Sequence, residues 1–238
     1  MTKTAYITGG SKGIGLGIAA ALLEMGMNVA ITGRTQEALE EAGAALGKIG
    51  KGEILAIQSD VRNYESEAQA IQQVVEQWGR LDVCIANAGV GKFADVDELD
   101  LDDWNAMIDI NLTGAFHTVK AAIPALKKTE GYIMTIASLA GTNFFQKGAA
   151  YNASKFGLVG FTQAIMLDLR PYGIKVTTIM PGSVSTYFNG RTPSDAEAWK
   201  IQPEDIGQMV VDLLKMNPRT LPSKVEVRPT IPKSVVRK

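Results

Sequence analysis

Short apolar runs alternate with longer amphipathic segments along the whole chain. The apolar runs predict strands at Thr4–Thr8, Asn28–Thr32, Glu53–Gln58, Asp82–Asn87, Tyr132–Ile136, Lys175–Met180 and Lys224–Val227. Most of these runs are apolar throughout, which is typical of strands covered on both faces of a parallel sheet. Between them, apolar positions recur at helical spacing, for example at Ala68, Ile71, Val75 and Trp78. The alternation predicts a single-domain Rossmann-type α/β fold, with a doubly wound parallel sheet of about seven strands and helices on both faces.

Two segments depart from this alternation, although no linker or change of composition divides residues 1–238, which we expect to form one domain. Residues 183–202 lack a sustained period and carry three aromatic side chains. A long irregular loop is uncommon in a compact domain unless it has a function, so we expect a mobile substrate lid there. The alternative is a rigid surface loop. Residues 228–238 hold two prolines and four basic side chains and predict a solvated C-terminal tail.

Charge and composition narrow the classes of partner. The formal net charge is −1, so no broad basic field is present to attract nucleic acid or an acidic membrane. The single histidine, His117, has no second imidazole, cysteine or carboxylate at ligand spacing, and we expect no metal site. Cys84 lies in an apolar run, where a buried thiol is expected. Without a signal region or a run of transmembrane length, we expect a cytoplasmic location and no membrane partner.

A glycine-rich turn follows the first predicted strand. It reads Thr8-Gly9-Gly10-Ser11-Lys12-Gly13-Ile14-Gly15, and a helix follows at once. Glycines bring backbone N–H groups close to a pyrophosphate, and the helix N-terminus adds its positive dipole end. Glycines also simply make turns, but the position between first strand and first helix favours a dinucleotide site.

The form T-G-x-x-x-G-I-G resembles the glycine turn of the short-chain dehydrogenase/reductase family, and further family motifs occur in order. They are Asp60-Val61, Asn87-Ala88-Gly89, Asn111 with Gly114, Ser138, Tyr151-Asn152-Ala153-Ser154-Lys155, and Pro181-Gly182 with Val184 and Thr186. The resemblance implies that the first motif contacts the adenine and that the last holds the nicotinamide. It covers residues 1 to about 185 and thins beyond them.

The candidate catalytic residues are Asn111, Ser138, Tyr151 and Lys155. Tyr151 and Lys155 are four residues apart and share a helix face. A nearby ammonium favours a phenolate, so we expect Lys155 to lower the pKa of Tyr151 toward the range useful for acid/base catalysis. Ser138 is expected to donate a hydrogen bond to the substrate oxygen, as an oxyanion-hole donor does. The resemblance implies that Lys155 also binds the nicotinamide ribose and that Asn111 holds a proton-relaying water.

Each of these residues has a simpler interpretation when taken alone. A tyrosine and a lysine at this spacing often form only a packing pair on a helix surface. Ser138 is also typical of a turn at a strand end, and Asn111 of a buried amide satisfied locally. Their joint occurrence downstream of a dinucleotide turn favours the catalytic interpretation.

The second strand indicates which cofactor is bound. It ends in Gly33 and Arg34 with no acidic residue at its tip, and Lys12 supplies a second cation. A guanidinium suits the 2′-phosphate of NADP(H), which we expect in preference to NAD(H). Glu37 lies close enough in sequence to keep NAD(H) open. The candidate cofactor-binding residues are Gly9, Ser11, Lys12, Gly13, Ile14, Gly15, Arg34, Asp60, Val61, Asn87, Ala88, Gly89, Tyr151, Lys155, Pro181, Gly182, Val184 and Thr186.

The expected function is hydride transfer between NADP(H) and a small carbonyl or alcohol substrate. No Gly-Gly pair follows the last strand, so the ending resembles carbonyl-reductase and sepiapterin-reductase-like branches more than 3-oxoacyl-carrier-protein reductases. A 3-oxoacyl-carrier-protein reductase stays an alternative. Nucleotide-sugar epimerases need a longer C-terminal substrate domain. A non-catalytic dinucleotide sensor would be favoured by loss of a catalytic residue, and all four are present.

Two further expectations concern surroundings of the site. The loop aromatics expected to line a partly apolar substrate pocket are Phe93, Phe144, Phe145, Tyr187 and Phe188. The helix beginning at Tyr151 is apolar nearly all round, and one sheet covers only part of a helix. We therefore expect a homodimer or homotetramer.

Overall fold

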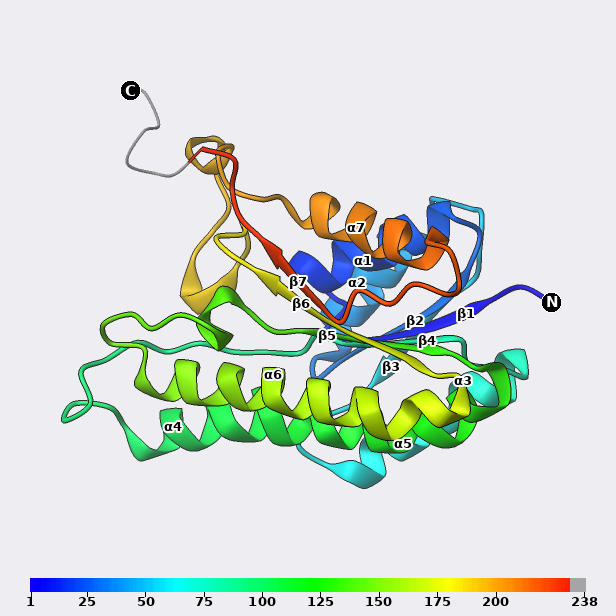
Figure 1. The fold of residues 1–238 in the computed structure, drawn as a ribbon. Coiled ribbons are helices and arrows are strands. Elements are labelled where there is room, and N and C mark those ends of the chain that lie inside the picture. The colour runs from blue at the N-terminus through cyan, green and yellow to red at the C-terminus, as the bar shows by residue number, and fades with distance from the viewer. Residues whose placement is uncertain (232–238) are drawn as a thin grey trace.

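The computed structural model describes residues 1–231, and seven strands form one sheet within them in the order β3-β2-β1-β4-β5-β6-β7 (Figure 1). The strands are β1 (Thr4–Thr8), β2 (Asn28–Gly33), β3 (Ile54–Gln58), β4 (Val83–Ala86), β5 (Tyr132–Ile136), β6 (Lys175–Pro181) and β7 (Lys224–Val227). Every neighbouring pair is parallel. The predicted doubly wound parallel sheet is confirmed.

The strand boundaries differ from the prediction by one residue in several places. Asp82 and Asn87 lie just outside β4 because their polar groups are used at its two ends. The Asp82 carboxylate accepts a hydrogen bond of 2.8 Å from the Thr4 amide, and the Asn87 amide donates one of 2.8 Å to the Thr8 carbonyl.

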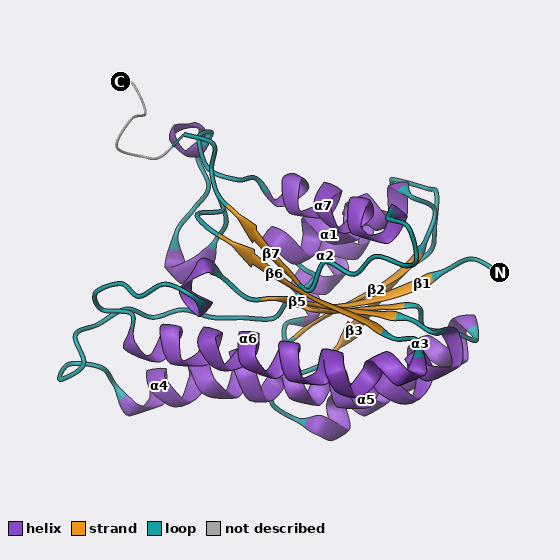
Figure 2. Ribbon diagram, viewed as in Figure 1, coloured by secondary structure: helices purple, strands orange, loops and turns teal. Residues whose placement is uncertain are grey.

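Helices cover both faces of the sheet, as Figure 2 shows. They are α1 (Gly13–Glu24), α2 (Gln36–Gly47), α3 (Tyr64–Trp78), α4 (Leu101–Ile108), α5 (Gly114–Thr129), α6 (Ala149–Leu169) and α7 (Pro203–Lys215). A π-helical turn, Asp109–Thr113, joins α4 to α5, and short 3₁₀ turns occur at Leu139–Gly141, Arg170–Tyr172, Phe188–Gly190 and Asp195–Glu197. Helices α1, α2 and α7 pack on one face, and α3, α5 and α6 pack on the other with α4 beside α6.

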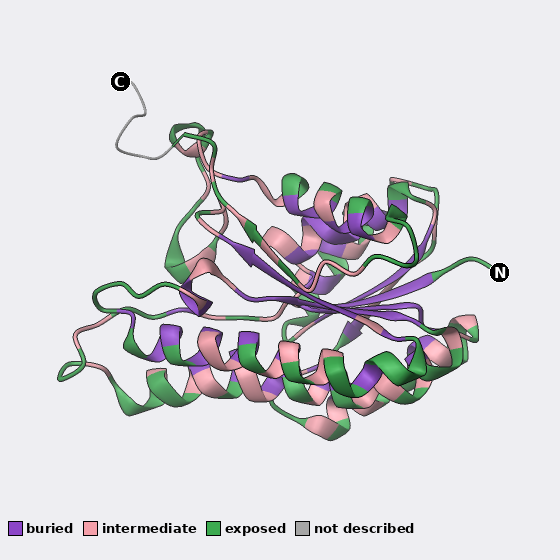
Figure 3. Cartoon of the chain, in the orientation of Figure 1, coloured by how far each residue is buried: buried purple, intermediate pink, exposed green. Residues whose placement is uncertain are grey.

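The five inner strands, β2, β1, β4, β5 and β6, are buried on both faces, as their apolar runs predict (Figure 3). The edge strands differ, because β3 is mostly half-buried and β7 alternates exposed and half-buried residues. Successive side chains of β1 enter different cores: Ile7 joins the core under α1 and α7, and Tyr6 joins the core under α3 and α5. The predicted stripe on α3 is partly wrong, because Glu67, Ala70, Ile71 and Val74 are its buried residues. The carboxyl side chain of Glu67 is therefore buried, although the periodicity predicts that it is exposed to solvent.

The parallel sheet places the carboxyl ends of β1, β4, β5 and β6 at one edge, on the left of Figure 1. Loops that follow these ends carry most of the candidate site. The chain continues from β7 toward the predicted tail, of which residues 232–238 lie outside the described residues. Among residues 1–231, no helix is both long and apolar enough to span a bilayer.

Candidate active site

The glycine turn between β1 and α1 has a backbone that only glycine adopts easily. Gly9 and Gly13 have φ of +64° and +56°, in the left-handed region. A Cβ on Gly15 would lie 2.4 Å from the Gly9 carbonyl oxygen, so a larger residue would force the turn apart. Lys12, which precedes α1, makes no side-chain cap, and the first amides of the helix stay available for an anion.

The Asn87-Ala88-Gly89 segment ties this turn to β4. The Asn87 side chain donates to the Thr8 and Gly9 carbonyls at 2.8 and 3.1 Å. The Thr8 hydroxyl accepts from the Asn87 and Ala88 amides, both at 3.0 Å. The side chain of Asn87 is therefore committed to the turn itself, a use that the motif alone did not reveal.

The segment after β6 crosses over the same turn. Gly182 donates its amide to the Val227 carbonyl at 2.7 Å, and Val184 forms a bridge to Ile201. Thr186 lies close enough to the turn that a Cβ on Gly13 would stand 3.3 Å from its methyl group. The predicted nicotinamide segment and the predicted phosphate turn are thus in contact.

Tyr151 and Lys155 lie on the first two turns of α6 and face the end of β5. The Lys155 ammonium is 5.8 Å from the centre of the Tyr151 ring and donates to the Ile136 carbonyl at 3.0 Å. Both side chains are buried. Ser138 follows β5, and its hydroxyl accepts from the Ala140 amide at 3.1 Å. Three of the four candidate catalytic side chains meet at one point of the sheet edge.

Burial sets the protonation of this group. It raises the pKa of Tyr151 to about 12, against which hydrogen bonding with Ser138 acts in the lowering direction. It also lowers the pKa of Lys155 to about 8. The expectation that the pKa of Tyr151 lies below its ordinary value is wrong, because desolvation of the phenolate by burial raises it and is the largest effect.

The fourth candidate, Asn111, lies in the π-helical turn and is fully buried. Its side-chain oxygen accepts from the Val90 amide at 2.8 Å, and its nitrogen donates to the Val90 carbonyl at 2.9 Å. The same nitrogen donates to the Ser154 hydroxyl at 3.0 Å. The side chain is satisfied locally, as the simpler interpretation has it, and it joins the loop after β4 to α6. Its predicted water relay stays a prediction.

Sequence reasoning missed Ser154 as a partner of the site. Its hydroxyl accepts from Asn111 and donates to the Tyr151 carbonyl at 2.9 Å. The position three residues after Tyr151, on the face that carries Lys155, was the available signal.

An aromatic wall surrounds Tyr151. The rings of Phe93 and Phe188 both lie 5.6 Å from its ring centre, and that of Phe145 lies at 6.4 Å. Phe144 instead stacks on Phe156 and is 83% exposed. Three of the predicted pocket aromatics therefore enclose the phenol, while Phe144 and the half-exposed Tyr187 line the cleft farther out.

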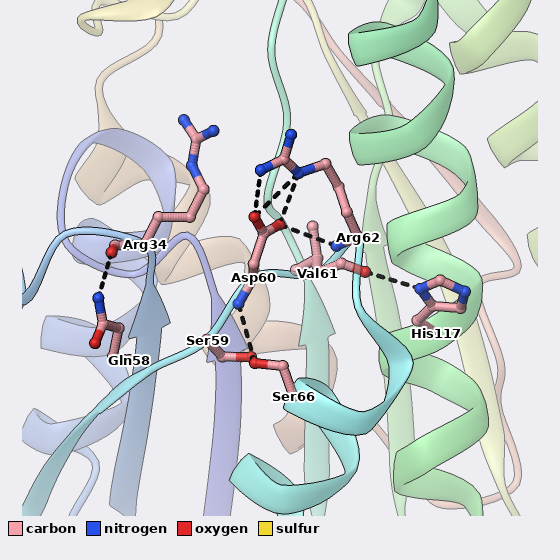
Figure 4. A network of polar contacts seen from close by, with 8 residues as sticks. All are labelled: Arg34, Gln58, Ser59, Asp60, Val61, Arg62, Ser66 and His117. Atoms are coloured by element: carbon pink, nitrogen blue, oxygen red, sulfur yellow. Dashed lines mark hydrogen bonds and ion pairs between the residues drawn. The ribbon is translucent and has the colours of Figure 1, made fainter.

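The opposite end of the site is built around Asp60 (Figure 4). The Arg62 guanidinium donates to both carboxylate oxygens of Asp60 and lowers its pKa. The Gln58 amide donates to the Arg34 carbonyl at 2.8 Å, and His117 Nδ1 lies 2.9 Å from the Val61 carbonyl. Among the described residues, no ion pair engages the Arg34 guanidinium. Sequence reasoning missed Arg62, although its place two residues after Asp60 was the signal.

One cleft of about 1480 Å³ joins the two ends. Its walls include Arg34 and Asp60 at one end and Tyr151 and Lys155 at the other. All candidate cofactor-binding residues line it except Gly15, which packs inside the turn. An elongated cleft with a glycine cradle, cations and an apolar end fits a dinucleotide. No cluster of three or more metal-ligating side chains occurs among residues 1–231.

Comparison with known proteins agrees with this geometry. The family model of the short chain dehydrogenases matches residues 3–197. The trans-4-hydroxycyclohexanecarboxylate dehydrogenase of Sinomonas cyclohexanicum is 40% identical over 193 residues, which cover 77% of this chain and 73% of that protein. An alcohol dehydrogenase from the archaeon Thermococcus sibiricus, complexed with 5-hydroxy-NADP, superposes with a TM-score of 0.91 at 30% identity over 97% of both chains. A metagenomic short-chain oxidoreductase in complex with NADP gives 0.84 at 33% identity, over 97% of this chain and 98% of that one. The chain belongs to the short-chain dehydrogenase/reductase family of oxidoreductases.

Proposed function

We propose that this oxidoreductase transfers hydride between NADP(H) and a carbonyl or alcohol substrate, with Tyr151 as the general acid/base. The observation that carries the proposal is the convergence of Tyr151, Ser138 and Lys155 at the apolar end of a cleft whose other end holds the glycine turn. A bound nicotinamide supplies or accepts the hydride.

The roles of the side chains follow from their protonation. A Tyr151 phenol with a pKa near 12 is neutral at physiological pH and holds a proton that it can donate to a carbonyl oxygen during reduction. Ser138 donates a second hydrogen bond to that oxygen and disperses its developing charge. Lys155, charged below about pH 8, favours the phenolate that remains after proton transfer.

Arg34 and Lys12 support NADP(H) as the cofactor. Lys12 lies in the glycine turn and Arg34 follows β2, and both line the cleft. The Arg34 guanidinium is not engaged in an ion pair among residues 1–231, so it is free to bind a 2′-phosphate. Arg62 forms an ion pair with Asp60, an acidic side chain that lines the same cleft. The NADP complexes among similar solved structures agree with this choice.

The aromatic lining of the reaction end favours substrates with a carbonyl on an alicyclic or aryl body. The rings of Phe93, Phe145 and Phe188 lie around Tyr151 and make this end of the cleft aromatic and apolar. The ring-bearing substrate named for the Sinomonas relative is in keeping with such a pocket.

Residues 183–202 act as the substrate lid in this proposal. Their two ends are joined by the Val184–Ile201 bridge, and Ser185 donates its amide to the Ile201 carbonyl at 2.9 Å. Between these ends, Phe188 packs on Tyr151 and Phe93. These backbone contacts fix the base of the segment, and in this proposal the part between them opens and closes over the substrate.

Self-association through the α4–α5–α6 face accounts for its exposed apolar side chains. Leu101 and Trp104 of α4 are 78% and 38% exposed, Phe116 of α5 is 43% exposed and Leu167 of α6 is 61% exposed. Covering them against a second copy removes apolar surface from water.

The test is a steady-state assay of NADPH oxidation with alicyclic and aryl ketones, aldehydes, 3-oxoacyl thioesters and pterins. We expect turnover with at least one ring-bearing ketone. Turnover confined to 3-oxoacyl thioesters would transfer the assignment to the alternative branch, and cofactor binding without any turnover would favour the sensor.

A further inference from the structure

Helix α3 buries a carboxyl side chain beneath the sheet. Glu67 has no exposed surface and lies among Ala70, Ile71 and Val74 on the face that packs toward β1 and α5. None of the ion pairs among residues 1–231 involves it. A buried carboxyl without a cation is costly unless hydrogen bonds satisfy it, so its partners indicate why it is there.

Three hydroxyl groups from three different elements hold Glu67. Tyr6 of β1 and Ser59, which follows β3, contact Oε1 at 3.1 and 2.6 Å. Thr118 of α5 contacts Oε2 at 2.7 Å. The carboxyl group therefore links the segment after β3 to the centre of the sheet and to the neighbouring helix.

The hydroxyl protons show which form of the carboxyl fits best. Thr118 contacts both Glu67 and the Gly114 carbonyl, at 2.7 and 3.0 Å, but its hydroxyl has one proton. The Gly114 oxygen can only accept, so the Thr118 proton is needed for that contact. If Glu67 is neutral, its own proton is donated to the Thr118 oxygen, and both contacts are then hydrogen bonds. Burial raises the pKa of Glu67, and the titratable groups around it are Tyr6, Cys84 of β4 and His117 of α5.

Glu67 is connected in this way to the end of the cleft that would hold adenosine. Ser59, Asp60 and Val61 line the cleft consecutively, and Figure 4 shows how the turn is held. The Asp60 amide donates to the Ser66 hydroxyl at 3.2 Å, and the Val61 carbonyl contacts His117. The contact of Glu67 with the Ser59 hydroxyl fixes the start of this turn.

We propose that Glu67 is a positioning residue for the adenosine half of the cofactor, which it serves by holding the 59–61 turn through a neutral carboxyl group. The inference rests on the proposed NADP(H) site. It assigns a function to a side chain that touches neither cofactor nor substrate.

The test measures binding of cofactor fragments by calorimetry, without any catalytic step. Adenosine 2′,5′-bisphosphate probes the turn, and reduced nicotinamide mononucleotide probes the reaction end. Glu67→Ala should weaken binding of the bisphosphate roughly tenfold, because the Ser59 hydroxyl at the start of the turn loses its acceptor. Binding of the mononucleotide should stay within about twofold. Glu67→Gln should bind both as the unmodified protein does, because its amide can accept from Ser59 and donate to Thr118.

Two further variants separate positioning from general stability. Ser59→Ala removes the hydroxyl that contacts both Glu67 Oε1 and Ser66 Oγ, at 2.6 and 3.0 Å. It should reproduce the selective loss even if Glu67→Ala fails to fold. Tyr132→Phe removes a buried hydroxyl that lies 2.7 Å from Thr177 Oγ1, at the far end of β5, and should change the unfolding temperature but neither affinity.

The outcomes also separate this inference from the proposed function. If the unmodified protein binds the bisphosphate and both Glu67→Ala and Ser59→Ala bind it equally well, the positioning role is wrong. Equal losses for the two fragments would likewise overturn it, since they indicate general damage. A Glu67→Gln variant as weak as Glu67→Ala would overturn the neutral carboxyl. Failure of the unmodified protein to bind the bisphosphate would refute the NADP(H) site itself.

Discussion

Gly91 provides the sharpest perturbation of the proposed lid. A Cβ on this residue would stand 2.2 Å from Cζ and 2.5 Å from Cε1 of Phe188, distances that real Cβ atoms do not show. The tip of a phenylalanine is the easiest of these groups to move, so Gly91→Ala should displace the Phe188 ring and leave the backbone in place. The substitution thereby opens the lid without altering any lid residue.

The magnitude follows from the contacts that Phe188 loses. Its ring packs on Tyr151 at 5.6 Å and on Phe93 at 6.4 Å. Aromatic pairs contribute roughly 0.5–1.5 kcal/mol each, so opening should become easier by about 1–3 kcal/mol. That corresponds to roughly a five- to hundredfold shift toward the open form.

Amide exchange and steady-state kinetics measure this shift. Exchange in the centre of residues 183–202 should accelerate in Gly91→Ala with cofactor bound, and kcat/KM for a ring-bearing ketone should fall by a comparable factor. Phe188→Ala is the matched background, because without the ring the added methyl has nothing to displace and should cost little. Unchanged exchange and unchanged kcat/KM in Gly91→Ala would refute the claim that the packing of the Phe188 ring against Gly91 holds the lid closed.

Three further predictions concern cofactor, assembly and pH. Arg34→Asp should remove a phosphate contact of about 1.5–3 kcal/mol, lower kcat/KM for NADPH by roughly ten- to hundredfold and shift the preference toward NADH. Equal efficiency with both cofactors in the unmodified protein would contradict this. Light scattering at micromolar concentration should give a multiple of the 25.5 kDa chain mass, whereas a monomer alone would refute self-association. Because burial lowers the pKa of Lys155 to about 8, the ammonium is lost as pH rises through that value, and kcat/KM for reduction should fall there; a flat profile between about pH 7 and 9 would count against the role of Lys155.

The sheet and its edge were predictable because they depend on patterns that are local in the chain. Continuous apolar runs specify strands buried on both faces, and parallel strands bring their carboxyl ends together. Gly9 and Gly13 have positive φ, and the glycines in the sequence already indicate such a backbone. Tyr151 and Lys155 share a helix face by spacing.

Burial and pairing across the sheet were not predictable in the same way. Spacing brings Lys155 near Tyr151 but does not say that both are desolvated, and desolvation reverses the expected direction of the tyrosine pKa. The period of α3 assigns a carboxyl group to solvent, yet Glu67 finds hydroxyl partners on β1 and α5 that are far away in sequence. Such partners become visible only once the fold brings the segments together.

Tyr151→Phe tests the central claim most directly. The change removes one oxygen and keeps the ring that packs against Phe93 and Phe188. Hydride transfer should be followed in a single turnover, as loss of NADPH absorbance with a ketone that the unmodified protein reduces, while NADPH affinity is titrated separately. We expect the rate to fall on the order of 10²–10⁴-fold, the usual contribution of a general acid, with NADPH affinity within about twofold of the unmodified protein. A variant that keeps most of its hydride-transfer rate would show that Tyr151 is not the acid/base.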